Sequence, residues 1–275
     1  MSLLDALILG VVQGLTEFLP VSSSGHLVLV QALLGVQPDG ITFEVFAHVG
    51  TLLALLVAYR STVLRLIRGV WALPQLSRGG PRDRETADDL RLLGLLLLAS
   101  VPAGLAGILL KPQIDWLFGS VELVGWMLLL TGGLLLVAER RARPAAAPVD
   151  PQQAARLSAG QALLMGIGQA LAILPGLSRS GTTLSFGLLA RLDRADAANF
   201  AFLMAIPAIG GAFLLTLVDL AQTGSPLEGT LLVGAAAAAV SGYGAIHALL
   251  RLVQRGRLWW FTLYTWAVGA WVLLT

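Results

Sequence analysis

An apolar segment that polar residues interrupt decides how this chain folds: residues 3–30 read LLDALILGVVQGLTEFLPVSSSGHLVLV. A helix of about 20 apolar residues spans the hydrocarbon core of a bilayer, so the segment is long enough to enter a membrane. Pro20 and the small polar residues after it break the helical pattern. Irregular backbone at membrane depth is tolerated only where protein or a water-filled cavity surrounds it. The segment therefore predicts a re-entrant helical hairpin beside a functional site.

A second interrupted segment, at about 160–190, repeats this pattern. At a constant offset of 156 residues, six residues of the first segment recur without a gap. The pairs are Gly10 with Gly166, Gln13 with Gln169, Leu15 with Leu171, Ser22 with Ser178, Ser24 with Ser180, and Gly25 with Gly181. We interpret the match as an internal repeat, with repeat one at about 1–140 and repeat two at about 158–275.

The composition of the chain is that of a membrane protein. Of 275 residues, 56% are hydrophobic and 12% are charged, whereas a soluble domain carries about 25% charged residues. Six further stretches predict transmembrane helices, at about 42–59, 92–110, 120–138, 197–218, 229–250 and 258–274. We predict an all-α integral membrane protein, a single polytopic domain over 1–275, with six transmembrane helices and two re-entrant hairpins.

Basic residues predict the orientation of these spans. Residues 1–59 contain no Lys or Arg, whereas arginines cluster at 60–91, 139–157, 191–194 and 251–257. By the positive-inside rule these four regions are cytoplasmic, and we expect a solvated loop at 78–91. Each half then has one hairpin and three spans, so the second half is inverted relative to the first. We expect a multi-pass protein of the bacterial inner membrane with both termini outside.

Composition also excludes several functions. The net charge is only +2 and the basic residues lie at helix ends, a distribution that indicates membrane topology and no nucleic-acid partner. The chain has no cysteine, which excludes disulfides, thiolate metal sites and a cysteine nucleophile.

The first hairpin carries the residues that predict catalysis. Gln13 and Glu17 are four residues apart and share one face of a helix. A charged carboxylate at membrane depth costs about 2–4 kcal/mol, so Glu17 needs a partner or a purpose. Ser22 and Ser23 offer hydroxyls, and His26 offers a base or a nucleophile. The alternative is that the serines bond to helix carbonyls while His26 lies at the membrane interface.

The second hairpin predicts an anion site. Arg179 is the one basic residue deep inside an apolar segment. Ser178, Ser180, Gly181 and Thr183 surround it with hydroxyls, a flexible backbone and a helix N-terminus, which together suit a phosphate. The alternative is that Arg179 neutralises the carboxylate of the first hairpin structurally. Apposed hairpins would complete a phosphoryl-transfer site, with charge stabilisation on one side and proton or metal chemistry on the other.

Both motifs resemble those of a known family. QGLTEFLPVSSSGH, at 13–26, resembles the Glu/Gln-x-x-x-Glu motif with downstream Ser and His of the undecaprenyl-diphosphate phosphatases, the bacitracin-resistance proteins. PGLSRSGTT, at 175–183, resembles the family's Pro-Gly-x-Ser-Arg-Ser-x-x-Thr motif. The resemblance assigns functional roles to Gln13, Glu17, Ser23, His26, Ser178, Arg179 and Thr183.

The resemblance also implies a reaction. The substrate would be the C55 isoprenoid diphosphate of peptidoglycan synthesis, the product its monophosphate, and the active site would face the periplasm. The family depends on a divalent cation, which implies Mg²⁺ or Ca²⁺ bound through Glu17 and diphosphate oxygens. Gln13 stands where the family allows Glu or Gln, so this chain has one carboxylate fewer for the metal.

Several alternatives stay open at this point. The nucleophile is Ser23, His26 or water. A transporter or flippase of a lipid phosphate would use the same inverted repeat. Small residues such as Gly242 allow close helix contacts, so a homodimer is a further hypothesis. We interpret Glu44 and His48, four residues apart near the outer end of a span, as a pair that reaches the membrane interface. The alternatives are that the pair supports the residues of the site or lines the substrate entrance.

Overall fold

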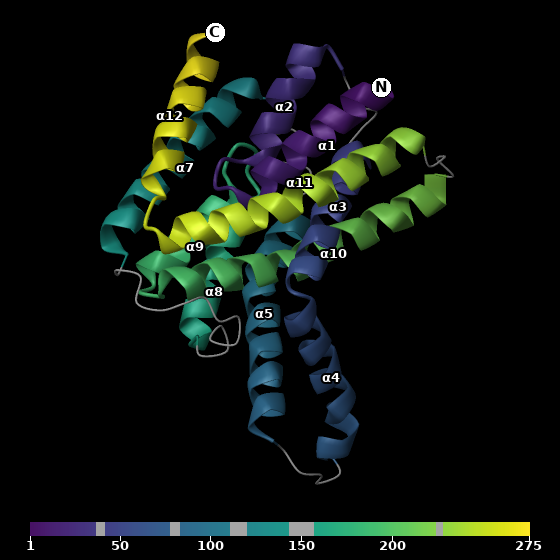
Figure 1. Ribbon diagram of the computed structural model, residues 1–275, viewed down its shortest axis with the longest axis vertical. Helices are drawn as coiled ribbons and strands as arrows, with labels where there is room; N and C mark the ends of the chain where they lie inside the picture. Colours follow the sequence, from purple (N-terminus) through teal and green to yellow (C-terminus); the bar gives the residue numbers. More distant parts are fainter. Residues whose placement is uncertain (37–41, 78–82, 111–119, 143–156, 224–227) are drawn as a thin grey trace.

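The computed structural model describes residues 1–36, 42–77, 83–110, 120–142, 157–223 and 228–275. These residues form eleven helices and no strand (Figure 1). The helices are α1 (Leu3–Phe18), α2 (Ser23–Leu34), α3 (Thr42–Ala58), α4 (Arg60–Ser77), α5 (Arg84–Leu109), α7 (Val121–Arg141), α8 (Ala159–Leu171), α9 (Arg179–Leu189), α10 (Arg194–Thr223), α11 (Gly229–Gln254) and α12 (Trp259–Leu274). The all-helical prediction is confirmed for this part of the chain.

Four of the described helices are long and apolar enough to cross a membrane: α5, α7, α10 as far as Val218, and α11. α3 and α4 pass the same test only as a pair, and the two helices meet at 83°. α3 has 17 residues and α12 has 16, so both are shorter than a full span of about 20. A multi-pass membrane protein is confirmed, with four spans by length and composition, or five if the bent pair counts as one.

Both predicted interruptions are breaks between two helices. α1 ends at Phe18, and α2 begins after Ser22, whose hydroxyl caps the helix by accepting from the N–H of Gly25. α8 ends at Leu171, and α9 begins after Ser178, whose hydroxyl accepts from the N–H of Gly181. A serine at the N-cap satisfies one of the backbone donors that lack a partner inside the helix, so the same residue type starts both helices.

Each broken segment packs closely against a long helix from the other half of the chain. α1 lies along α11, where a Cβ added at Gly10 would stand 2.3 Å from the carbonyl oxygen of Gly234. α8 lies along α5, where a Cβ added at Gly166 would stand 2.3 Å from the carbonyl oxygen of Ala99. Glycine at both positions lets the backbones approach closely, as small residues do between membrane helices.

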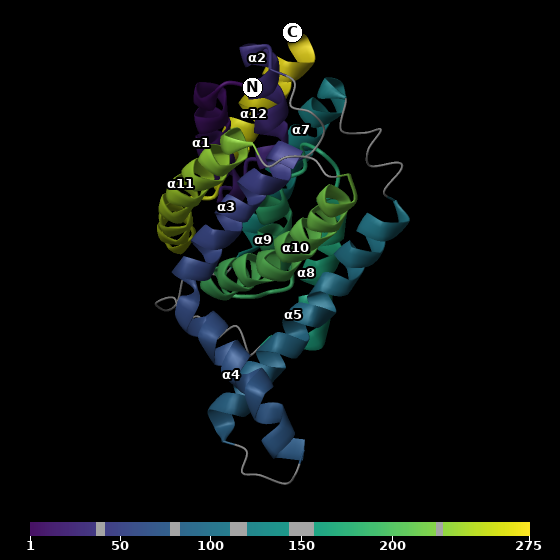
Figure 2. The ribbon, with the colours of Figure 1, turned by 90° about the vertical axis from the view of Figure 1, so that its right-hand side faces the viewer.

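The stretch at 78–91 differs from its prediction. Residues 78–82 and most of 139–157 lie outside the described residues, but α5 begins at Arg84, so the prediction of a loop is wrong for 84–91. Asp83 is the cause, because its carboxylate accepts from the N–H of Thr86 at 2.6 Å and caps the helix. Glu85 in the first turn adds a favourable interaction with the helix dipole. α4 and the start of α5 extend beyond the other helices at one end of the molecule (Figure 2).

Candidate active site

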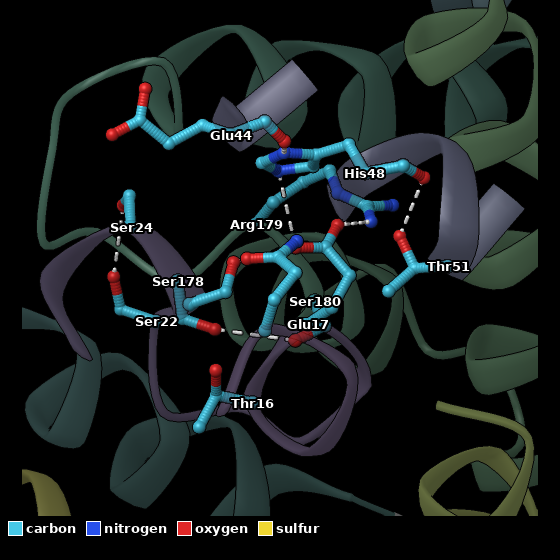
Figure 3. A network of polar contacts seen from close by, with 12 residues as sticks. Thr16, Glu17, Ser22, Ser24, Glu44, His48, Thr51, Ser178, Arg179 and Ser180 are labelled. Carbon is cyan, nitrogen blue, oxygen red and sulfur yellow. Dashed lines mark hydrogen bonds and ion pairs between the residues drawn. The ribbon is translucent and has the colours of Figure 1, made fainter. Parts of the chain in front are cut away.

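Glu17 is the centre of a polar network in which four helices meet (Figure 3). Its carboxylate accepts from Gln13 Nε2 at 3.0 Å and from the Ser23 hydroxyl at 2.5 Å. Arg179 donates to its other oxygen, and His48 Nε2 lies 3.4 Å from Oε2. Only 4% of the Glu17 side chain is exposed. The carboxylate therefore has the partners that a charge at membrane depth requires.

The helix breaks put these groups in place. Gln13 and Glu17 lie one turn apart on α1, directly before the first break. Ser23 is the first residue of α2, and Arg179 is the first residue of α9. Two helix N-termini therefore meet around one carboxylate. Each N-terminus carries a partial positive charge that favours an anion.

Both N-termini leave backbone donors available. Ser23 and Ser24 open α2, and Arg179 and Ser180 open α9. The first N–H groups of a helix have no acceptor inside it. In the described part of the chain, the N–H groups of these four residues donate to no other acceptor. These free backbone donors and the guanidinium of Arg179 are the groups that an anion at this junction could use.

Most of the other predicted binding residues build the two turns. Ser22 Oγ lies 3.3 Å from Ser24 Oγ, and Ser178 Oγ lies 3.2 Å from Ser180 Oγ. The N–H of Gly181 donates to Ser178 Oγ at 3.1 Å. Because Ser22, Ser178 and Gly181 are engaged in capping, their contribution is to shape the N-termini.

Hydrogen bonds also join the two turns to each other. The hydroxyl of Ser180 donates to the carbonyl of Leu19 at 3.0 Å, and the N–H of Gly176 donates to Ser24 Oγ at 3.4 Å. Thr183 lies deeper, because its buried hydroxyl donates to the carbonyl of Arg179 at 2.8 Å. The hydroxyl of Thr183 therefore supports the first turn of α9 from within the helix.

His26 forms no hydrogen bond or ion pair with Ser23 or Glu17 in the described part of the chain. Its Nδ1 lies 2.7 Å from the carbonyl oxygen of Ser22, and its Nε2 lies 2.7 Å from the hydroxyl of Tyr264 on α12. A carbonyl only accepts, so Nδ1 carries a hydrogen, and in the neutral ring Nε2 accepts from Tyr264. The His26 and Tyr264 rings also stack, with centroids 5.6 Å apart. Ser23 and His26 therefore belong to two separate hydrogen-bonded pairs, Ser23 with Glu17 and His26 with Tyr264.

Sequence reasoning missed two of these partners. The interface position favoured for His48 is wrong, because its Nε2 lies 3.4 Å from Glu17 Oε2, as the alternative of a pair that supports the site allows; Glu44 accepts from Gln31 at 3.1 Å. An ionisable residue within an apolar helix is itself a signal of a site, and that signal applies to His48 as it does to Glu17. Nothing in the sequence distinguishes Tyr264 from the aromatic residues that anchor helices at the interface.

The donor set suits a metal that arrives with a phosphate ligand. No three His, Cys, Asp or Glu side chains gather into a metal site among the described residues. Oε1 of Gln13, however, is buried without a hydrogen-bond partner beside Glu17. Mg²⁺ in proteins is commonly held by one or two carboxylates, with phosphate oxygens and water completing the shell. One carboxylate and one free amide oxygen fit that arrangement.

Comparison with known proteins places the chain in a family. Residues 6–271 match the family described as bacitracin resistance protein BacA. The chain belongs to this family. It is 44% identical over 272 residues to the undecaprenyl-diphosphatase of Desulfosudis oleivorans, covering 97% of this chain and 96% of that protein. Proteins of the same name from Desulfatibacillum aliphaticivorans and Methanobrevibacter smithii are each 40% identical to this chain, and both matches cover 98% of it. The matches cover 98% of the first relative and 96% of the second. The family that the two motifs indicate is confirmed.

Proposed function

We propose that this BacA-family chain hydrolyses undecaprenyl diphosphate to undecaprenyl phosphate and inorganic phosphate, and so recycles a lipid carrier of cell-wall synthesis. The relatives named undecaprenyl-diphosphatase support the reaction, because the matches cover nearly all of both chains. The observation that carries the proposal is the junction of two helix N-termini, one opened by Arg179 and one by Ser23, around the carboxylate of Glu17.

Arg179 and the free amides of both N-termini hold the diphosphate in this proposal. A guanidinium and backbone N–H groups suit phosphate oxygens by charge and by geometry. Arg179 is paired with Glu17 in the structure, and 18% of its side chain is exposed. It can therefore turn one face of its guanidinium to a ligand while the carboxylate keeps it in place. Arg179 can therefore both neutralise Glu17 and bind the diphosphate, so the two interpretations of this residue are compatible.

Ser23 is the hydroxyl best placed to act on the terminal phosphorus. Glu17 lies 2.5 Å from its oxygen and is positioned to accept a proton, either from Ser23 as its hydroxyl attacks or from a water bound beside Ser23 that attacks instead. The bond from the terminal phosphorus to the bridging oxygen breaks, and undecaprenyl phosphate leaves. If water attacks, inorganic phosphate forms in this step; if Ser23 attacks, the phosphoryl group is transferred to its oxygen, and a water then hydrolyses the phosphoserine to inorganic phosphate and restores the hydroxyl. His26, held by Tyr264, lies outside this contact, so a direct role for His26 requires its Nε2 to leave the Tyr264 hydroxyl.

A divalent cation, Mg²⁺ or Ca²⁺, is part of the proposal. Glu17 and Gln13 Oε1 would hold it together with oxygens of the diphosphate. When bound, it neutralises charge on the phosphate oxygens. Because Gln13 adds no charge, the ion depends more on the substrate for its ligands than it would beside two carboxylates.

The proposed membrane architecture keeps six spans and two re-entrant hairpins in an inverted repeat. Its support is the reciprocal packing of α1 on α11 and of α8 on α5, and the matching serine caps of α2 and α9. Such repeats place their site near the midplane, between the broken segments. We propose that the protein lies in the bacterial inner membrane and that the site opens to the periplasm.

Phosphate release by the purified protein tests the proposal. Wild type in detergent, with a C55 diphosphate and Mg²⁺ or Ca²⁺, should release phosphate. Arg179→Ala should lower the rate by roughly 10²–10³-fold, the scale of losing one preorganised donor to a developing charge. Arg251→Ala, an exposed arginine on α11, is the matched control and should retain full activity.

A transporter is the alternative function, because carriers share this kind of repeat. The contact of Ser23 with Glu17 favours hydrolysis, since moving an anion requires no activated hydroxyl. Absence of phosphate release by wild type, with lipid movement in proteoliposomes, would favour the carrier.

A further inference from the structure

α4 has the composition of a helix that lies on a membrane surface. It contains three arginines, Arg60, Arg65 and Arg68, and no acidic residue. These arginines alternate along the helix with large apolar residues. Interfacial helices combine a basic polar face, an apolar face with Trp or Leu, and low net hydrophobicity.

The direction of α4 fits the same position. α4 follows α3 after a single residue, at an angle of 83°. If α3 runs across the bilayer, α4 runs nearly along its plane. A helix along the bilayer plane keeps all of its residues at a similar depth.

The contact with α5 indicates the depth of α4 relative to the membrane. Arg65 Nε lies 3.3 Å from Oδ1 of Asp89, and a Cβ added at Gly69 would be 3.6 Å from a methyl carbon of Leu90. The charged first turns of α5 end here, and its long apolar run starts at Leu92. α4 therefore crosses α5 where the charged start of that helix gives way to its apolar run. Figure 2 shows the two helices crossing in the part of the molecule that projects beyond the other helices.

The face of α4 turned away from α5 carries both kinds of residue. Leu64, Ile67 and Trp71 are 51%, 46% and 79% exposed and follow one another at helical spacing. Arg60 and Arg68 are exposed beside them. Tryptophan prefers the level of the headgroups, and arginine extends its charge toward phosphates while its stem stays in apolar surroundings.

We propose that α4 is an interfacial anchor whose exposed face binds the acidic phospholipid headgroups of one leaflet. Among the described residues, neither Arg60 nor Arg68 forms an ion pair. The leaflet supplies negative charge for these arginines and the apolar layer that covers Leu64, Ile67 and Trp71. The surface is separate from the site around Glu17, and its test does not depend on the proposed activity.

Depth measurements with spin labels test the proposal directly. The chain has no cysteine, so Leu64→Cys, Ile67→Cys and Trp71→Cys each give one labelled site in full-length protein. In vesicles of phosphatidylcholine and phosphatidylglycerol, nitroxides at all three sites should report nearly equal, shallow depths by oxygen and nickel-chelate relaxation. Leu97→Cys, exposed within the apolar run of α5, is the deep reference.

Two outcomes of this measurement would overturn the proposal. A spanning or re-entrant α4 would give graded depths, with sites 64 and 71 differing by about 10 Å at 1.5 Å per residue. A solvated α4, or one covered by a partner protein, would leave all three labels outside the lipid.

The lipid charge is tested with the label at residue 71. Phosphatidylglycerol should draw this label deeper than phosphatidylcholine alone does, and Arg60→Gln with Arg68→Gln should remove the difference. Equal depth in both vesicle types for the chain with native arginines would refute binding to acidic headgroups.

Discussion

The ion pair of Glu17 and Arg179 predicts strong energetic coupling between the two hairpins. Glu17→Gln keeps the shape of the side chain but leaves Arg179 without its anionic partner. Removing one member of a buried pair costs about 3–5 kcal/mol, and we expect about 3 kcal/mol because part of Arg179 is exposed. Arg179→Gln should cost a similar amount, since it leaves a carboxylate that is almost fully buried.

The double variant separates coupling from the cost of each change. The double variant carries neither charge of the pair, so neither is left without a partner. Its loss of unfolding free energy should therefore be roughly 2 kcal/mol smaller than the sum of the losses of the two single variants. Unfolding in detergent, followed by tryptophan fluorescence without substrate, measures all four proteins. Each single variant should melt about 10 °C lower than wild type.

A matched carboxylate provides the control for this cycle. Glu44→Gln on α3 keeps the hydrogen bond from Gln31 and should cost less than about 1 kcal/mol. The inference that this pair holds α1 and α9 together would be refuted if the free-energy losses of the two single variants summed to that of the double variant within about 0.5 kcal/mol.

Three further predictions concern the positioning of His26, the helix packing and the metal. Tyr264→Phe removes the donor to His26 Nε2. Because Nδ1 of the same ring donates to the carbonyl of Ser22, directly before Ser23, we expect Ser23 to be positioned less firmly and kcat to fall about 3- to 10-fold with KM little changed. Tyr243→Phe, beside His247 on α11, should leave kcat unchanged, and equal kcat values for both variants would exclude a role for the Tyr264 hydroxyl. Gly166→Ala should destabilise the protein by about 1–3 kcal/mol in thermal unfolding because its Cβ meets the backbone of α5, while Gly94→Ala, with open space around it, should be neutral or stabilising. Chelation by EDTA should abolish phosphate release and added Mg²⁺ or Ca²⁺ should restore it; full activity after chelation would argue against the metal.

The sequence predicts the breaks and their polar residues because these are local properties. Proline does not fit inside a helix, and serine caps the start of one, so Pro20, Ser22 and Ser178 mark the breaks by themselves. In the structure, α2 and α9 begin directly after Ser22 and Ser178. The contacts of His48 and Tyr264 are set by the packing of α3 and α12, across long separations in sequence. No local pattern contains that information. The helical start of α5 at Arg84 is a different case, because the capping residue Asp83 was visible in the sequence.

The two hairpins share a frame and differ in the residues that carry chemistry. The serine caps and the paired serine hydroxyls occur in both turns at the offset of 156 residues. At the same offset Ser23 corresponds to Arg179, and Glu17 to Ile173. One turn therefore contributes a hydroxyl and a carboxylate, and the other contributes a cation, so the two halves form a complementary site that neither could form alone. Exchanging Ser23 for arginine would place two guanidinium groups at one junction, and it should abolish activity while leaving both caps intact.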